Sequence, residues 1–300
     1  MNTEYTSTPE QPLISVVVPL YNHSKYIEQC LNSIKDNGWK RIELIIIDDG
    51  SIDHSYAIAH SWLFSNANYL EKYALSKQQN LGITKTLNKL IVQCTGDFIV
   101  VVASDDYLLE NSIKERYDYL NENKKKLAVF TDAIGIDDNG IKICSSVIEE
   151  KFQGHTNNLV DEHKIAKELI LNWCVPGPVF MARKEAYQEM GLYDEQYFIE
   201  DRYFYLKLLS EGRIGFLAKS LSAYRIHTAS ISGNKTRQIA VGLEILKIEK
   251  NLLNKFSGIN KFYLQIQMWS NFSQVHHSNM KVLLIIRCVF SKIVKQVLQI

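Results

Sequence analysis

The chain has 300 residues and a formal net charge of +1, from 34 basic against 33 acidic residues, so it gives no support for bulk nucleic-acid binding, which needs concentrated positive charge. This length, with an ordinary 22% of charged residues, allows a substantial buried core, as one large domain or one domain with an added region. The five cysteines are scattered without a Cys-x-x-Cys pair, which argues against a zinc knuckle and favours reduced thiols in a cytosolic protein.

Residues 1–12 are polar and lack the apolar core of a secretory signal, so we expect a flexible N-terminus. Apolar β-branched runs then alternate with amphipathic segments as far as residue 108, which predicts alternating strands and helices. The predicted strands cover residues 14–20, 42–47, 69–76 and 98–103. The first predicted helix begins at a cap, Asn22 or Ser24, and ends near residue 35. A second predicted helix starts from the turn at 48–51, and a third covers residues 83–93. This alternation predicts a parallel sheet with right-handed crossovers.

The pattern is looser after residue 108. Helices are predicted over residues 109–123, near 161–171 and over 200–211, and strands over 127–133, 141–148, 179–182, 214–217 and 221–225. From about residue 236 the strand signal disappears. Three amphipathic segments, 239–254, 260–276 and 281–299, predict a helical C-terminal region over 236–300.

Two of the predicted buried strands end in pairs of aspartates, Asp48 with Asp49 and Asp105 with Asp106. In a doubly wound sheet the carboxyl ends of neighbouring strands face a common crevice, where ligands bind. Paired carboxylates there are unfavourable unless a cation compensates them, and a divalent metal that carries a diphosphate would do so. The alternative is a pair of acidic turns, since aspartate is common in turns and helix caps. Two such pairs on one α/β framework favour a ligand site.

Six segments resemble, in the same order, the motifs of family 2 glycosyltransferases. Residues 14–22, which contain Pro19, Tyr21 and Asn22, resemble the opening strand of that family. Residues 48–51, Asp-Asp-Gly-Ser, are similar to its second motif, and residues 80–88, with Asn80-Leu81-Gly82 and Asn88, resemble its third.

The later motifs complete the resemblance. Residues 104–106, Ser-Asp-Asp, stand where the family has its DxD-type metal motif, and Glu200 with Asp201 resembles its acceptor motif. Residues 224–227, Tyr-Arg-Ile-His, resemble a basic motif of many bacterial members. The motifs span residues 14–227, about three quarters of the chain.

The resemblance implies an α/β protein with the GT-A fold, a Rossmann-like, mostly parallel sheet flanked by helices. It implies a catalytic domain over residues 13–235, with a nucleotide-binding half (13–108) and an acceptor half (109–235), followed by the helical C-terminal region. It also implies a nucleotide-sugar donor, Mn²⁺ or Mg²⁺ as cofactor, and inversion at the anomeric carbon.

Asp106 is the expected metal ligand and His227 a further candidate ligand, while Asp105 serves either the metal or the ribose and sugar of the donor. A metal there would stabilise the charge that develops on the departing diphosphate. The arginine that many members carry after the third motif is replaced here, so Lys85 or Lys77 is the candidate phosphate-facing cation. Arg225 is a second candidate phosphate clamp, or simply part of a surface strand end. The donor-binding candidates are Pro19, Tyr21, Asn22, Asp49, Asn80, Lys85 and Asp105.

Asp201 is the candidate general base, because it lies at the start of a predicted helix, where the dipole favours an ionised carboxylate. Direct attack by a hydroxyl that it deprotonates would invert the anomeric centre. Glu200 and Trp173 are candidate acceptor-binding residues. Alternatively, Glu200 and Asp201 are ordinary acidic residues in the first turn of a helix, and Trp173 packs in the core.

We therefore expect an inverting, metal-dependent glycosyltransferase with a UDP-sugar donor. Its saccharide acceptor would be linked to undecaprenyl diphosphate, for O-antigen or capsule synthesis at the cytoplasmic face of the bacterial plasma membrane. A nucleotidyltransferase would instead need a glycine-rich phosphate loop, and residues 20–24 contain no glycine. A non-catalytic sugar-nucleotide-binding scaffold would have lost an acid from the metal or base set, and none is missing.

The last predicted helix, 281–299, combines apolar residues with four basic residues and no acid. This composition suits a peripheral contact of residues 280–300 with anionic lipids, and the alternative is a helix packed on the protein or on a partner. No stretch of the chain is long enough without charge to be a predicted transmembrane helix.

Deletion of residues 280–300 tests this membrane contact. We expect the truncated protein to stop co-sedimenting with vesicles that contain anionic phospholipid, because the basic and apolar side chains that would bind them are gone. Vesicles of neutral phospholipid serve as the control. Unchanged co-sedimentation would contradict the prediction.

Overall fold

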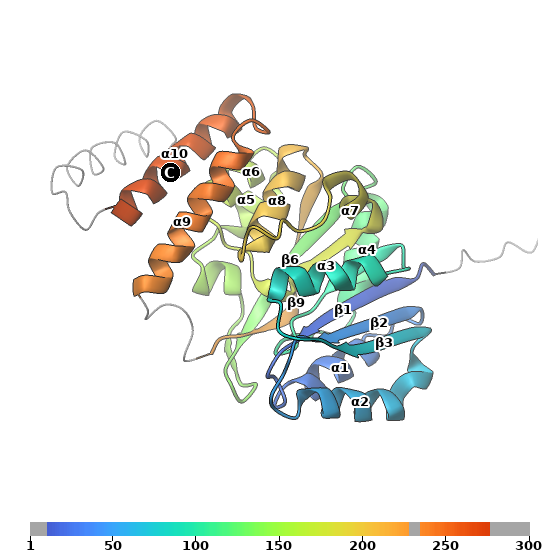
Figure 1. The fold of residues 1–300 in the computed structure, drawn as a ribbon. Coiled ribbons are helices and arrows are strands. Elements are labelled where there is room, and N and C mark those ends of the chain that lie inside the picture. Colours follow the sequence, from blue (N-terminus) through green and yellow to red (C-terminus); the bar gives the residue numbers. More distant parts are fainter. Residues whose placement is uncertain (1–10, 228–234, 277–300) are drawn as a thin grey trace, which may run out of the picture.

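The computed structural model describes residues 11–227 and 235–276. These residues form one nine-stranded sheet in the order β3-β2-β1-β4-β8-β6-β9-β5, with β7 paired to β6, and helices cover both of its faces (Figure 1). Apart from residues 11 and 12, the predicted N-terminal segment lies outside the described residues, and so does the predicted helix 281–299.

The first half of the sheet is parallel, as predicted. β1 (Ile14–Leu20) pairs with β2 (Ile42–Asp48) and with β4 (Phe98–Val101), and β2 pairs with the exposed β3 (Lys72–Lys77). Continuous apolar runs form β1 and β2 because both faces of these strands are buried. The crossovers are α1 (Ile27–Lys35), α2 (Ser55–Asn66), a 3₁₀ turn at Ala67–Tyr69, and α3 (Ile83–Gln93).

The predicted cap of the first helix is wrong. Helix α1 begins at Ile27, so Asn22 and Ser24 lie before its first turn. The Ser24 N–H donates to Asp53, and Asn22 adopts a left-handed backbone with φ 54°. Both residues therefore shape the loop after β1.

The second half of the sheet is mixed, because β8 (Phe180–Arg183) runs antiparallel between β4 and β6 (Ala128–Ile136). The two strands predicted over 214–225 form a single strand, β9 (Ile214–Arg225), which pairs in parallel with β6 through register shifts around Asp132. The remaining elements are β5 (Tyr107–Leu108), α4 (Ser112–Glu122), β7 (Lys142–Cys144), a π-helical turn (Val147–Lys151), α5 (Thr156–Val160), α6 (Ile165–Leu171), a 3₁₀ turn (Gly177–Val179), α7 (Lys184–Met190) and α8 (Glu200–Ser210).

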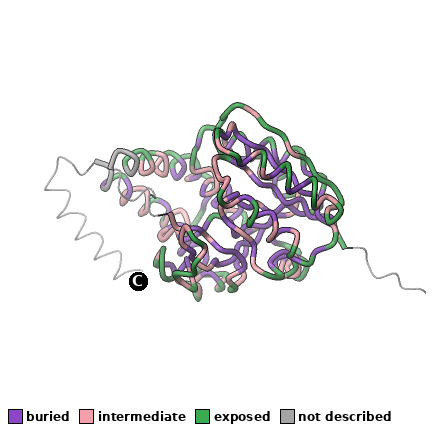
Figure 2. The backbone as a smooth tube through the Cα atoms, turned by 90° about the horizontal axis from the view of Figure 1, so that it is seen from below, coloured by how far each residue is buried: buried purple, intermediate pink, exposed green. Residues whose placement is uncertain are grey.

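Two apolar cores lie on the two faces of the sheet. One core contains the inner sides of α1, α2 and α4, and the other contains those of α3, α6, α7 and α8. The second core also takes buried side chains from α9 (Lys235–Leu252) and α10 (Gly258–His276). In Figure 2 the buried stretches of the backbone gather in the interior, and the exposed stretches lie along the outside. The two C-terminal helices thus pack against α6 and α8.

The topology brings six strand ends to one edge of the sheet. Strands β1, β2, β3 and β4 are mutually parallel, and two successive antiparallel pairings through β8 make β6 and β9 run in the same direction as β4. The loops that follow these strands therefore meet at one edge, where an open α/β sheet binds its ligands. In the described part of the chain, no helix is long and apolar enough to cross a bilayer.

Candidate active site

A cleft of ≈ 250 Å³ lies at this edge. It collects four of the predicted donor-binding residues, from the loops after β1 and β2 and from the third motif. Its lining residues are Pro19, Leu20, Tyr21, His23, Asp49, Asn80, Gly82, Ile83, Thr86, Ala103 and Ser104. The wall is mainly apolar, with a few polar groups, which is the usual make-up of a small-molecule site.

Asp49 builds this cleft as well as lining it. Its carboxylate accepts hydrogen bonds from the backbone N–H groups of Leu81 (2.8 Å) and Gly82 (2.9 Å) and from the Gln78 amide (2.8 Å). The second and third motifs are therefore joined to each other. Gly50 has φ +85°, and a Cβ there would lie 2.8 Å from the Asn80 backbone nitrogen, so this close approach needs glycine.

Asn22 joins the loops after β1 and β2. Its N–H donates to the Ser51 hydroxyl and its side-chain oxygen accepts from the Ile52 N–H, each at 2.9 Å. Asn22 thus lies beside the cleft and holds its shape, while a direct contact with the donor stays a prediction.

The two candidate lysines differ in position. Lys85 is exposed, and the described residues that line the cleft include no lysine. The Lys77 ammonium donates to the Ser51 carbonyl at 2.9 Å and lies 3.9 Å from Asp48. Lys77 therefore stabilises the turn of the second motif.

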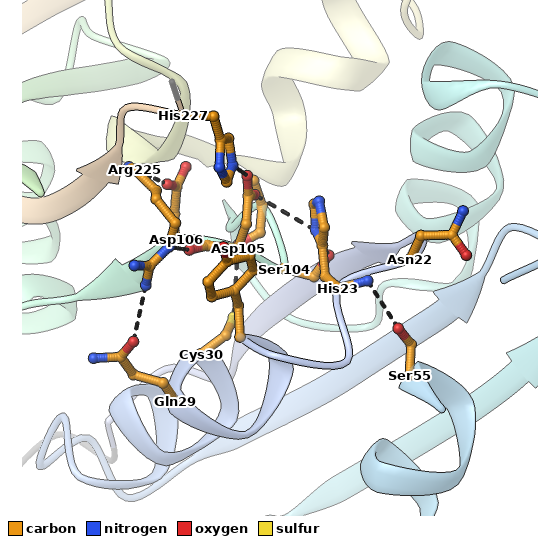
Figure 3. A network of polar contacts seen from close by, with 12 residues as sticks. Asn22, His23, Gln29, Cys30, Ser55, Ser104, Asp105, Asp106, Arg225 and His227 are labelled. Carbon is orange, nitrogen blue, oxygen red and sulfur yellow. Dashed lines mark hydrogen bonds and ion pairs between the residues drawn. The ribbon is translucent and has the colours of Figure 1, made fainter. Parts of the chain in front are cut away.

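The acidic pair after β4 occupies two different environments (Figure 3). Asp106 is 3% exposed, and one of its oxygens accepts the backbone N–H of Arg225 at 2.7 Å. Burial and the neighbouring Asp105 raise the pKa of Asp106 well above its ordinary value. Asp105 is more open, and one of its oxygens lies 2.9 Å from the His227 imidazole.

His227 is held between two carboxylates. Its Nε2 lies 2.9 Å from Asp105 and its Nδ1 lies 2.6 Å from Asp138. Burial alone lowers the pKa of His227, but the hydrogen bonds to Asp105 and Asp138 outweigh it and raise the pKa above its ordinary value. A carboxylate on the second ring nitrogen is the usual arrangement for orienting a metal-binding histidine. Asp138 is not among the site residues predicted from the sequence.

Arg225 is engaged entirely by the protein. Its guanidinium donates to the carbonyls of Asp105 (2.8 Å) and Asp137 (2.7 Å) and to the Gln29 side chain (2.9 Å), and it lies over the Tyr26 ring at 4.2 Å. Arg225 thus ties the ends of β4, β6 and β9 together, and a phosphate-clamping role stays a prediction.

His23 is the residue that sequence reasoning missed. It lines the cleft, its Nδ1 lies 2.8 Å from the Ser104 hydroxyl, and the same atom lies 3.7 Å from Asp105 (Figure 3). Burial lowers the pKa of His23, and the nearby Asp105 offsets part of this effect. His23 therefore connects the cleft to the acidic pair.

The acidic pair offers carboxylate oxygens to a divalent cation. Among residues 11–227 and 235–276, no three His, Cys, Asp or Glu side chains form a complete set of ligands. Carboxylate oxygens are nevertheless the donors that Mg²⁺ and Mn²⁺ prefer, with phosphate and water oxygens filling the other positions. The raised pKa of Asp106 also indicates a place where a cation would favour the ionised form. The residues present thus fit a metal that is shared with a diphosphate.

The candidate base lies at the start of α8. Asp201 is half-buried, burial raises its pKa above the ordinary value, and its carboxylate accepts the Arg202 N–H at 2.6 Å. Burial and the adjacent Asp201 raise the pKa of Glu200 to about 8. Burial, then Asp106, Asp105 and Asp201, raise the pKa of Tyr224 to about 12, which places Tyr224 within electrostatic reach of both acidic groups.

Trp173 packs against the same helix. Its ring meets the Tyr205 ring edge-on at 5.6 Å, and the Arg202 guanidinium lies 5.1 Å from its centre. The ring is half-buried, so contact with an acceptor sugar stays a prediction.

Comparison with known proteins agrees with this geometry. The model of the family described as glycosyl transferase family 2 matches residues 15–191, more than half of the chain. The chain belongs to glycosyl transferase family 2. It is thus a glycosyltransferase, which decides against the nucleotidyltransferase alternative. This family 2 glycosyltransferase matches curated relatives at 25–32% identity and spans between 31% and 76% of their lengths.

One relative and two solved structures illustrate these similarities. The Campylobacter jejuni GalNAc(5)-diNAcBac-PP-undecaprenol beta-1,3-glucosyltransferase is 25% identical over 81% of this chain and 75% of its own length. Staphylococcus aureus TarS 1-349 with UDP-GlcNAc has a TM-score of 0.66 at 22% identity, over 89% of this chain and 74% of its own. The Pyrobaculum calidifontis mannosyltransferase PcManGT with GDP-Man and Mn²⁺ has a TM-score of 0.65 at 12% identity, over 95% and 81%. The family 2 glycosyltransferase described here therefore has the GT-A fold.

The raised pKa of Glu200 predicts a pH-dependent loss of stability. The folded protein holds the Glu200 proton up to about pH 8, whereas the ordinary value is 4.5, so the folded state loses stability as the pH rises through this window. Glu200→Gln should therefore raise the melting temperature at pH 8, by about 2–4 °C for each kcal/mol recovered. Thermal denaturation at pH 4 should show no such gain. The control is Glu211→Gln, at the exposed far end of α8. An equal gain at both pH values would refute the assignment.

Proposed function

We propose that this glycosyltransferase is inverting and metal-dependent and moves a sugar from a UDP-sugar to a hydroxyl of a saccharide acceptor. The acceptor is linked to a polyprenyl diphosphate, and the reaction serves the assembly of a bacterial surface polysaccharide, such as O-antigen or capsule, at the cytoplasmic face of the plasma membrane. The observation that carries this proposal is the cleft at the strand ends, which adjoins Asp105 and Asp106 through His23 and Ser104.

The cleft suits the nucleoside of the donor. Its apolar wall, Pro19, Leu20 and Ile83, offers contact area to a flat base, and polar groups such as Asn80 and Thr86 offer hydrogen bonds. A nucleoside seated there directs its diphosphate towards His23 and the acidic pair. The TarS structure was solved with UDP-GlcNAc, which supports a UDP-sugar for this chain.

Asp105 and Asp106 would hold the divalent cation, with His227 as a further ligand. Bound there, a metal supplies positive charge that stabilises the departing diphosphate. Asp138 fixes the orientation of His227 through its second ring nitrogen. The Mn²⁺ in the PcManGT complex supports this cofactor.

Asp201 acts as the general base. Burial raises its pKa, so that once ionised it is a stronger base than an exposed aspartate. It takes the proton from the attacking hydroxyl, and direct attack at the anomeric carbon inverts the configuration. The leaving diphosphate needs no proton, so one carboxylate suffices. The Campylobacter relative is named for an undecaprenol-linked substrate, which supports a lipid-linked acceptor here.

A donor panel tests the proposed reaction. UDP-glucose, UDP-galactose, UDP-GlcNAc, UDP-GalNAc and, as the control nucleotide, GDP-mannose are incubated with Mn²⁺ and a synthetic GlcNAc-diphospho-undecaprenol. We expect nucleotide release from one UDP-sugar only when both the metal and the acceptor are present. Turnover of GDP-mannose alone would exclude a UDP-sugar donor, and turnover after metal removal by EDTA would exclude metal dependence.

Asp201→Asn tests the base. The variant should bind UDP with wild-type affinity, because the cleft is untouched, while kcat falls by about 10²–10⁴-fold. The measurements are calorimetric titration with UDP and steady-state kinetics with the active pair of the panel. Asp118→Asn, on the surface of α4, is the matched control. Transfer by Asp201→Asn at a near wild-type rate would show that another group is the base.

Asp106→Asn tests the metal site without relying on activity. In the wild type, Mn²⁺ should tighten UDP binding, because the cation joins the acidic pair to the diphosphate. The amide retains an oxygen for the Arg225 N–H but has no charge, so most of the enhancement by Mn²⁺ should vanish. The affinity for UDP in the presence of Mn²⁺ should therefore fall by about tenfold, or 1.4 kcal/mol. Calorimetric titration of UDP with and without Mn²⁺ measures it, and an undiminished enhancement would place the metal elsewhere.

A further inference from the structure

The helix that carries the candidate base is held at its start by a residue from a distant helix. The N-cap of α8 is Ile199, whose side chain contains no hydrogen-bond acceptor, and the third helical residue is Arg202, where a capping box would have an acid. The N–H groups of Phe198 and Ile199 instead donate to one oxygen of Glu244 in α9, at 2.7 Å for Ile199. A carboxylate near a helix N-terminus also interacts favourably with the helix dipole.

One face of α9 repeats this contact along the segment before α8. Asn251 donates to the Tyr197 hydroxyl at 2.5 Å, and the Lys247 ammonium lies 5.3 Å from the centre of the Tyr197 ring. Glu244, Lys247 and Asn251 are spaced at i, i+3 and i+7, so they share one side of the helix. This face of α9 therefore fixes both the segment and the first turn of α8.

Helix α3 holds the same segment from the other side. Asn88 exchanges two hydrogen bonds with the backbone of Tyr193 (2.9 and 3.0 Å), and the Thr84 hydroxyl donates to the Tyr197 carbonyl at 2.8 Å. Ile83 and Thr86 of α3 line the donor cleft. The segment between α7 and α8 thus lies between the helix of the donor cleft and the C-terminal helix α9.

We propose that Glu244 is a positioning residue for sugar transfer: it fixes the start of α8 and so sets the place of the Asp201 carboxylate relative to a donor in the cleft. This inference rests on the proposed role of Asp201 as the base. Transfer requires the base, the hydroxyl and the anomeric carbon to be aligned, and a displacement of about 1 Å in such an arrangement lowers the rate by about 10²-fold. Without Glu244, the two residues that lead into α8, Phe198 and Ile199, lose the carboxylate that their backbone N–H groups share.

Two substitutions at one position separate positioning from charge. Glu244→Ala removes the acceptor, whereas Glu244→Gln keeps an amide oxygen that accepts the same two N–H groups. With the active pair of the donor panel we expect kcat to fall by about tenfold or more in Glu244→Ala and to stay within about threefold in Glu244→Gln. The UDP dissociation constant should be unchanged in both, because the donor cleft is intact. Glu211→Ala, which removes the same charge at the exposed far end of α8, should match the wild type.

A second measurement needs no substrate. Amide hydrogen exchange of residues 197–202 should be about tenfold faster in Glu244→Ala and unchanged in Glu244→Gln and Glu211→Ala, since only the first loses the hydrogen bonds. Unchanged exchange, or an unchanged kcat, in Glu244→Ala overturns the positioning role. Normal transfer by Asp201→Asn would instead remove the base from the proposed function. Normal transfer by Glu244→Ala beside an inactive Asp201→Asn would overturn the positioning role alone.

Discussion

Negative charge gathered at one edge of the sheet is the constraint that the surrounding structure satisfies. Six strands run in the same direction, so their following loops meet, and these loops carry Asp49, Asp105, Asp106 and Asp138. Buried carboxylates are unfavourable unless hydrogen bonds or positive charge compensate them. Asp49 is satisfied by backbone N–H groups, and Asp105 and Asp138 share the His227 imidazole. Asp106 keeps one backbone hydrogen bond and a raised pKa, so a cation beside it would favour its ionised form.

Arg225 shows how the protein uses its own cation at this edge. The guanidinium donates hydrogen bonds to the carbonyls of Asp105 and Asp137 and to the Gln29 side chain. It therefore connects three strand ends and α1. A planar guanidinium with five N–H donors can bond several separate acceptors at once, whereas a lysine presents its charge at one atom. The positive charge stays beside the acidic pair, hydrogen-bonded to the Asp105 carbonyl at 2.8 Å. The basic motif is therefore as much a structural connector as a candidate ligand set, with His227 as the member that remains near the cleft.

The sequence predicted what depends on local patterns and missed what depends on distant contacts. The strand 14–20 and the helix 83–93 match β1 and α3 residue for residue, because buried strands and amphipathic helices have distinct periodicities. The single strand β9 was missed because exposed residues near Lys219 in its middle resemble a turn. The motif residues were recognised by resemblance, but His23 and Glu244 bear no local signal. Their importance arises from neighbours such as Ser104 and Ile199, many residues away in the chain.

Directional polar contacts, as well as buried apolar area, hold the C-terminal helices against α8. Arg202 and Glu249 form an ion pair at 2.9 Å with side chains 4% and 0% exposed, and Asn271 of α10 donates to both Glu249 oxygens. A buried ion pair adds little net stability, because desolvation offsets the attraction. It does restrict geometry, since the guanidinium meets the carboxylate in only one register of α9 against α8. The same register brings Glu244 to the start of α8. A purely apolar contact would allow α9 to slide along α8. The polar network prevents this, which explains how a helix outside the sheet can fix the position of Asp201.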